Sequence, residues 1–174
     1  MKKSLIIVII LVIVIAIIGV VYFASLNKEQ PTNANEQQES INQSVTYTLD
    51  YEGKNMTPGQ AFSKEVFGEE KQYSEIPSCA FEGSDKVYNY GSYEITTSQI
   101  NGEEKIYSVS LLDDTISTKE GIKLADDKAK MIEIYGENYR ENGTEYIYSD
   151  GNVNLSFILQ NDVIISIQYT MVTE

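Results

Sequence analysis

The 174-residue chain contains no histidine and no tryptophan, only three prolines, and a single cysteine, Cys79. Without histidine it lacks the commonest general base, the usual zinc ligand, and the Ser-His-Asp and Cys-His arrangements of nucleophilic catalysis. One cysteine excludes an intramolecular disulfide, so we expect Cys79 to be a small buried side chain. An intermolecular disulfide or a reactive thiol is the alternative. The chain is therefore predicted to be non-enzymatic, with no cofactor and no metal site; an enzyme that uses two carboxylates is the minor alternative.

Basic residues are also scarce. The chain has 13 Lys and Arg against 26 Asp and Glu, a net charge of −13. Apart from Lys2 and Lys3, every charged side chain follows residue 24, and that part of the chain carries 11 basic and 26 acidic residues, a net charge of −15. This excess opposes binding to nucleic acid, which needs clustered Lys and Arg. It favours solubility, basic partners or divalent cations.

One long hydrophobic run is present, at residues 5–24, and reads LIIVIILVIVIAIIGVVYFA. A helix of about 20 residues spans roughly 30 Å, the hydrocarbon thickness of a bilayer. The run is therefore predicted to be a transmembrane helix and a signal anchor. Because Lys2 and Lys3 precede it, residues 1–4 are expected in the cytoplasm and the remainder outside the cytoplasmic membrane. The composition, rich in Ile, Lys, Glu and Asn, is typical of a bacterial protein.

A cleaved signal peptide is the alternative interpretation of this run. Such peptides have an apolar core of roughly 7–15 residues and then a small-x-small cleavage site. Here the core is longer, and Tyr22 or Phe23 would stand at the −3 position. An uncleaved anchor is therefore favoured. Residues 25–44, rich in Asn, Gln, Glu and Ser, are predicted to be a disordered linker.

Residues 45–174 are long enough for one domain with its own core, and they contain a weak duplication. Met56–Gly68 aligns without gaps with Leu124–Gly136; both segments have apolar residues at helical spacing and end in glycine. Strand patterns follow each predicted helix, at 87–91, 92–98 and 105–111 and at 145–149, 154–160 and 163–169. We expect an α+β fold of two similar units in tandem, 45–116 and 117–174, each a helix followed by an antiparallel meander.

Three shorter signals refine this expectation. Asn101-Gly102 and Asn161-Asp162 predict tight hairpin turns at equivalent places. Asp150-Gly151 predicts the turn of a preceding hairpin. The first unit carries extra residues, 73–84, which predict an additional strand around Cys79.

Alternation along the predicted strands separates two faces. The apolar face, which can receive the helices, is predicted to carry Tyr107, Val109, Leu111, Leu155, Phe157, Leu159, Ile165, Ile167 and Tyr169. The opposite face is predicted to carry Glu94, Thr96, Ser108, Ser110, Ser156, Ser166 and Gln168. This second face is expected to be either hydrated or covered by a partner.

Tyrosine is abundant, with 13 residues. Tyr88 and Tyr90 share one face of a predicted strand, and Tyr146 and Tyr148 recur at the equivalent place. Tyrosine offers a large rigid surface with a polar tip, which suits protein interfaces. These four residues are the candidate binding residues; the alternative is that they line the core or edge of the domain.

The pattern of a helix ending in an aromatic residue and glycine, followed by a Tyr-rich meander that closes on YSV or ISI, resembles the β-lactamase-inhibitor-protein-like repeat. That repeat is shared with small outer-membrane-assembly lipoproteins. The segment Glu120–Tyr139 is the most similar part. The resemblance implies tandem α/β units whose sheet forms a concave protein-binding face. The true inhibitors are secreted and disulfide-bonded, and none of their inhibitory loops matches this chain.

Together these features predict a membrane-anchored, extracytoplasmic, acidic protein-binding module whose partner is another protein of the cell envelope. The alternative, which the resemblance alone implies, is an inhibitor of an envelope hydrolase such as a β-lactamase or a cell-wall enzyme.

Overall fold

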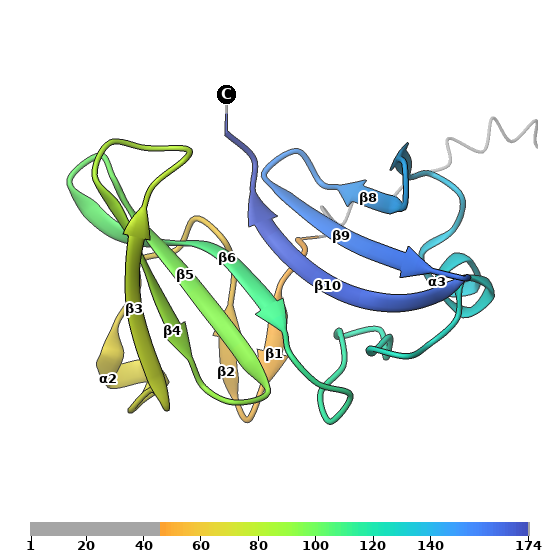
Figure 1. Ribbon diagram of the computed structural model, residues 1–174, viewed down its shortest axis with the longest axis horizontal. Helices are drawn as coiled ribbons and strands as arrows, with labels where there is room; N and C mark the ends of the chain where they lie inside the picture. The colour runs from red at the N-terminus through yellow and green to blue at the C-terminus, as the bar shows by residue number, and fades with distance from the viewer. Residues whose placement is uncertain (1–45, 174) are drawn as a thin grey trace, which may run out of the picture. The chain divides into compact units, whose positions relative to one another are not determined.

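The computed structural model describes residues 46–173, which belong to one compact unit (Figure 1). The predicted transmembrane helix at 5–24 and the predicted linker at 25–44 lie outside the described residues. Among residues 46–173, no helix is both long enough and apolar enough to cross a membrane.

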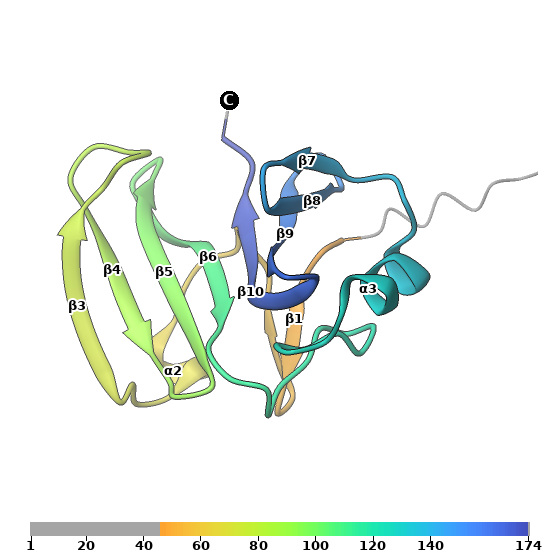
Figure 2. The same ribbon diagram turned by 45° about the vertical axis from the view of Figure 1, so that its right-hand side comes forward.

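The described part of the chain is mostly antiparallel sheet with two short helices. Its elements are β1 (Leu49–Tyr51), β2 (Lys54–Met56), α2 (Lys64–Phe67), β3 (Gln72–Pro77), β4 (Ser84–Asn89), β5 (Tyr93–Ile100), β6 (Glu103–Leu111), α3 (Lys128–Tyr135), β7 (Arg140–Asn142), β8 (Glu145–Ser149), β9 (Val153–Gln160) and β10 (Val163–Met171). β1 and β2 form a hairpin of their own, and the other eight strands form one sheet in the order β3-β4-β5-β6-β10-β9-β8-β7 (Figure 2).

Each helix is followed by a four-stranded meander, α2 by β3 to β6 and α3 by β7 to β10. The last strands of the two meanders, β6 and β10, pair antiparallel at the centre of the sheet. The expected α+β fold with antiparallel meanders is therefore confirmed. The helices are shorter than predicted, four residues in α2 and eight in α3, because the residues before each helix pair with a central strand instead.

This pairing follows the same backbone pattern in both halves. In the first half the bonds run from Gly59 N to Ile106 O (2.7 Å), from Ile106 N to Gln60 O (2.9 Å) and from Phe62 N to Glu104 O (2.9 Å). In the second half they run from Ala125 N to Ile164 O (2.9 Å), from Ile164 N to Asp126 O (2.8 Å) and from Lys128 N to Asp162 O (2.9 Å).

The pairing also corrects the sequence alignment of the two helical segments. Gly59 and Ala125, which make equivalent hydrogen bonds, are 66 positions apart. Gly68 and Gly136, which end the helices with φ of 83° and 77°, are 68 positions apart. The ungapped alignment is thus right at the helix ends and wrong by two residues in the strand-paired segments that precede the helices.

The tight turns occur where the sequence predicts them. Asn101 and Gly102 have φ of 55° and 81°, and Asn161 and Asp162 have φ of 53° and 62°. Positive φ at both central residues is the type I′ geometry, whose twist matches that of the flanking strands. Both hairpin predictions are confirmed.

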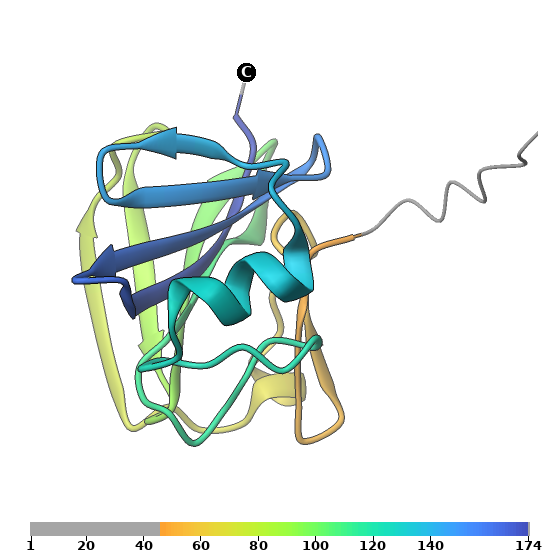
Figure 3. The same ribbon diagram turned by 90° about the vertical axis from the view of Figure 1, so that its right-hand side faces the viewer.

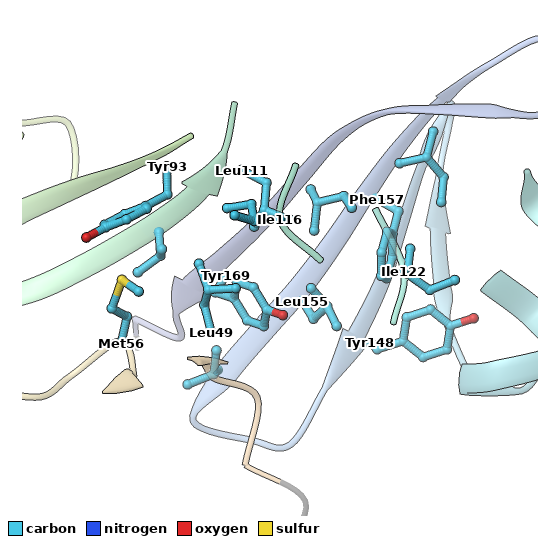
Figure 4. Close-up of a cluster of buried hydrophobic side chains, with 14 of the residues drawn as sticks. Leu49, Met56, Tyr93, Leu111, Ile116, Ile122, Tyr148, Leu155, Phe157 and Tyr169 are labelled. Atoms are coloured by element: carbon cyan, nitrogen blue, oxygen red, sulfur yellow. The ribbon is translucent and has the colours of Figure 1, made fainter. Parts of the chain in front are cut away.

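The hydrophobic core lies on one face of the eight-stranded sheet, which we call the packed face. Phe67 of α2 and Met131 of α3 belong to the same buried cluster as the inward side chains of the central strands. Figure 4 shows Leu49 of the β1–β2 hairpin beside Tyr169 of β10 and Met56 of the same hairpin on the side of Tyr93 of β5. Both helices and the hairpin therefore cover the same side of the sheet (Figure 3).

Two β-bulges change which face two residues occupy. In β6 Ser108 pairs with Thr96 and Ile106 with Thr97, so Tyr107 is the extra residue. In β10 Ile165 is extra in the same way, between Ile164 and Ser166. The prediction that Tyr107 and Ile165 lie on the apolar face is wrong, because a bulge moves one residue out of the alternation. The other seven residues predicted for that face are buried.

Candidate functional site

The candidate site is the face of the sheet opposite α2, α3 and the β1–β2 hairpin, which we call the open face. Strand register places one row of open-face side chains across all eight strands: Gln72, Asn89, Glu94, Ser110, Gln168, Ser156, Ile147 and Arg140. A second row, from β4 to β8, contains Val87, Thr96, Ser108, Thr170, Asn154 and Ser149. The predicted polar face is therefore one continuous surface.

The centre of the open face is built from small polar side chains on β6 and β10. Gln168 donates a hydrogen bond from Nε2 to Ser110 Oγ at 3.1 Å, which joins the two halves of the sheet. Ser110, Ser156 and Gln168 remain half-buried, so their hydroxyl and amide groups can be reached from outside. Such groups donate and accept hydrogen bonds but supply no nucleophile with an adjacent base. This chemistry suits recognition.

The β3–β4 loop, residues 78–83, covers part of the open face in the first half. The ring of Phe81 contacts the bulge residue Tyr107 edge to face, with centroids 5.7 Å apart and planes at 89°. Asp85 and Ser98, which alternation also places on the open face, are buried, and Ser98 donates a hydrogen bond to the Asp85 carboxylate. The loop thus provides an internal example of an aromatic ring seated on this face.

The same loop contains the only cysteine. Cys79 is free and exposed, so the expectation of a buried side chain is wrong. The additional strand predicted from residues 73–84 is present as β3, but it ends at Pro77, before Cys79. Proline cannot donate to a strand ladder and commonly stands at such an end.

The four candidate tyrosines lie on the packed face. Tyr88, Tyr146 and Tyr148 are buried and Tyr90 is half-buried. Register confirms that they recur at equivalent places, since Tyr88 pairs with Ile95 and Tyr146 with the equivalent Phe157. This placement agrees with the alternative that the sequence left open, in which these residues pack within the domain. We do not carry them into the proposed binding surface.

Most of their hydroxyl groups have partners inside the domain. Tyr88 donates to Glu104 at 3.0 Å and Tyr148 to the carbonyl of Gly136 at 2.8 Å, while Tyr146 accepts from Lys128 at 2.7 Å. Burial raises the pKa of Tyr148 to about 12. Burial likewise raises the pKa of Tyr90 to about 12. The Tyr90 and Tyr148 hydroxyls therefore stay protonated at neutral pH.

Glu104 is the acceptor of a polar network on the packed face. Its carboxylate accepts from Lys86 Nζ at 2.7 Å, Thr97 Oγ1 at 2.8 Å and Tyr88 OH at 3.0 Å. Burial raises the pKa of this carboxyl group, but the three hydrogen bonds and the charge of Lys86 outweigh burial and hold the pKa below its ordinary value. Because two donors lie on β4 and one lies on β5, the network ties β4, β5 and β6 together.

Two surface pockets flank α2. One, of about 610 Å³, is lined by Lys64, Gly68 and three glutamates. The other, of about 300 Å³, is lined by three tyrosines, Tyr93 among them, together with lysine and glutamate side chains. Charged side chains around an open depression are typical of a hydrated surface. Within residues 46–173, no group of three or more Cys, Asp or Glu is placed to hold a metal ion.

Sequence reasoning missed the aliphatic residues that the bulges and register bring to the open face, Ile147, Ile158 and Ile165. A signal for the bulges was present. Ile106-Tyr107-Ser108 and Ile164-Ile165-Ser166 each have two consecutive apolar residues before a strictly alternating run. Such a doubled residue breaks the period of two, as an extra residue in one strand requires.

Comparison with protein-family models, with curated proteins and with solved structures found no match to this chain. The resemblance to the β-lactamase-inhibitor-protein-like repeat therefore stays a prediction from the sequence motifs.

Proposed function

We propose that this protein is a non-enzymatic binding module that recognises another protein through the open face of its eight-stranded sheet. The observation that supports the proposal is the polar, half-buried centre of that face, around Ser110, Ser156 and Gln168. Both helices and the β1–β2 hairpin pack on the other side. The centre of the open face is therefore accessible to another molecule.

A loop of the partner is the occupant we propose for this face. The small side chains of β6 and β10 let a partner backbone approach closely, and their hydroxyl and amide groups offer hydrogen bonds in both directions. The sheet holds these groups in fixed register, so little ordering entropy is lost on binding. The described residues include 22 acidic and ten basic side chains, a net charge of −12 that attracts a basic partner.

We place this module outside the cytoplasmic membrane of a bacterial cell, anchored by residues 5–24. The uninterrupted apolar run and the two preceding lysines support this location. We also infer that the two helix-plus-meander units arose by duplication. The recurring pre-helix hydrogen bonds and the equivalent bulges at Tyr107 and Ile165 support that inference.

A cross-linking capture experiment tests the function. The full chain, solubilised in a mild non-ionic detergent, is the bait for an envelope extract of the source organism. We expect one saturable partner whose capture weakens as salt rises, because the field of the acidic domain is screened. Ser110→Tyr, which fills the centre of the open face, should abolish capture.

Ser63→Tyr is the matched control. Ser63 is also a half-buried serine, but it precedes α2 on the packed side of the sheet. Both variants must retain the circular dichroism of the unmodified chain. Equal capture by Ser110→Tyr and by the unmodified protein would contradict recognition through the open face.

A further inference from the structure

The two halves of the sheet have diverged on the open face. Strand pairing makes β4, β5 and β6 equivalent to β8, β9 and β10, and the packed face of each half contributes to the buried apolar cluster, with the Glu104 network as a polar addition in the first half. On the open face, four positions that are polar in the first half are aliphatic at the equivalent places of the second half. The equivalent pairs are Asn89 and Ile147, Thr96 and Ile158, Lys105 and Val163, and Tyr107 and Ile165.

These substitutions create an aliphatic patch, formed by Ile147, Ile158, Val163 and Ile165 on β8, β9 and β10. Ile165 is 52% exposed, Val163 39% and Ile158 37%, while Ile147, on the neighbouring strand β8, is 8% exposed. Ile147 is buried but does not belong to the main core cluster. The exposed aliphatic side chains, on the two neighbouring strands β9 and β10, keep apolar surface in contact with water, which is unfavourable.

The first half shows what occupies the equivalent position. There the bulge residue is Tyr107, and the ring of Phe81 is seated against it. Phe81 reaches it because the β3–β4 connection has six residues, 78–83. In the second half only residues 143–144 connect β7 and β8, so this connection cannot fold over Ile165. The position that the β3–β4 loop covers in the first half is left uncovered by residues 46–173 in the second.

The charged residues around the aliphatic patch indicate the charge of a segment that covers it. Glu145 is the open-face neighbour of Ile158, and Asp162 stands in the turn before Val163. Arg140, which pairs with Ile147, is the one basic residue in the open-face row that contains Ile147. With a net charge of −12 over the described residues, a loop that carries basic residues is favoured over an acidic one.

We propose that the aliphatic patch binds an aromatic side chain that a loop of the partner protein carries between basic residues. The inference rests on the proposed binding function and names the part of the partner that the second half of the sheet recognises. The partner's ring takes the place on Ile165 and Ile158 that Phe81 takes on Tyr107. The partner's basic residues then lie near Glu145 and Asp162.

A methyl NMR titration tests the proposal. The full chain, in a lipid nanodisc and labelled at isoleucine δ1 methyl groups, is titrated with the peptide acetyl-Arg-Phe-Arg-amide. We expect upfield ring-current shifts at Ile158 and Ile165 several times larger than those at Ile76 and Ile134, which are also exposed but lie outside the patch. Acetyl-Arg-Ala-Arg-amide should produce no such shifts, and acetyl-Glu-Phe-Glu-amide weaker ones.

A matched pair of variants completes the test. Ile165→Ser should remove the shift at Ile158, whereas Ile134→Ser on α3 should leave it unchanged. Both residues are exposed, so neither substitution removes a core contact. Equal shifts at all four isoleucines, an unchanged Ile158 shift in Ile165→Ser, or no shift up to the solubility limit of the peptide would each overturn the proposal.

The capture experiment separates this proposal from the function on which it rests. A partner whose capture is lost with Ser110→Tyr and reduced at least tenfold with Ile165→Ser supports both. A partner lost with Ser110→Tyr but captured normally by Ile165→Ser leaves the binding function standing and overturns the role of the patch.

Discussion

Replacing Glu104 with glutamine tests the polar network that joins β4, β5 and β6. The carboxylate accepts hydrogen bonds from Lys86, Thr97 and Tyr88 at 2.7, 2.8 and 3.0 Å. Glutamine keeps the shape and one acceptor oxygen but removes the negative charge opposite Lys86. The side chains of Glu104 and Lys86 are 23% and 33% exposed, so the pair lies between a surface and a buried ion pair.

The energies of buried and of surface ion pairs bound the loss of stability expected for Glu104→Gln. Breaking a fully buried pair costs about 3–5 kcal/mol, and a surface pair contributes about 0–1 kcal/mol. We therefore expect Glu104→Gln to lower the free energy of unfolding by about 2 kcal/mol at neutral pH. Glu103 provides the matched control on the same strand. Its side chain is 68% exposed and lies 3.4 Å from Lys105, so Glu103→Gln should cost less than about 0.5 kcal/mol.

The pH dependence gives a second, independent readout. The folded-state pKa of Glu104 lies below its ordinary value of 4.5. Its stabilising contribution is therefore complete above the unfolded-state pKa and is lost as pH falls through the folded-state pKa. The difference between Glu104→Gln and the unmodified chain should be full above about pH 5 and should shrink toward zero in stronger acid.

Urea titrations of the full chain in non-ionic detergent, followed by circular dichroism, measure both effects. Each variant is compared with the unmodified chain at neutral pH and in acid. Equal destabilisation by Glu103→Gln and Glu104→Gln would refute the network as a source of stability. A Glu104→Gln difference that persists unchanged in strong acid would refute the assignment of a lowered pKa.

Three further measurements probe the packed face. Met131→Ala should lower the free energy of unfolding by about 2–5 kcal/mol, because it opens a cavity in the core. Ile134→Ala, on the exposed side of α3, should lower it by less than about 1 kcal/mol. Thermal melts of the two variants measure the difference. Tyr148→Phe should cost about 1 kcal/mol in urea titrations, since it removes the hydrogen bond to Gly136. Tyr169→Phe should be neutral or stabilising, because the Tyr169 hydroxyl is buried without a partner among the described residues. In an ultraviolet pH titration, Tyr90 and Tyr148 should stay protonated up to about pH 11, because burial raises the pKa of each to about 12; ionisation of all 13 tyrosines near pH 10 would contradict this.

The sequence predicted the strands and turns well because both depend on local chemistry. Alternation marks a half-buried strand whatever its partners are, and Asn101-Gly102 adopts positive φ through its own residues. The six predicted strands all correspond to observed ones, β4 to β6 and β8 to β10. The helices were overestimated because Gly59 and Phe62 hydrogen-bond to β6, a contact with residues more than forty positions away that helical spacing cannot reveal.

In the candidate site, too, the sequence predicted what depends on local pattern and missed what depends on strand pairing. Sequence alternation identified the polar face and its serines, since these follow from the period of two. It assigned Tyr107 and Ile165 to the wrong face because each bulge is defined by the pairing of two strands. The four tyrosines were recognised as equivalent, but only the positions of α2 and α3 decide that their face is the covered one.

By itself, then, the sequence determined local quantities: the acidic charge, the absence of histidine chemistry, the strand periods and the turns. Tertiary structure decided the rest. Glu103 and Glu104 are chemically identical neighbours, yet one is mostly exposed and the other accepts three hydrogen bonds. Ile164 and Ile165 likewise differ only in the face they occupy. Burial and pairing depend on residues distant in the chain, so only the folded sheet could distinguish them.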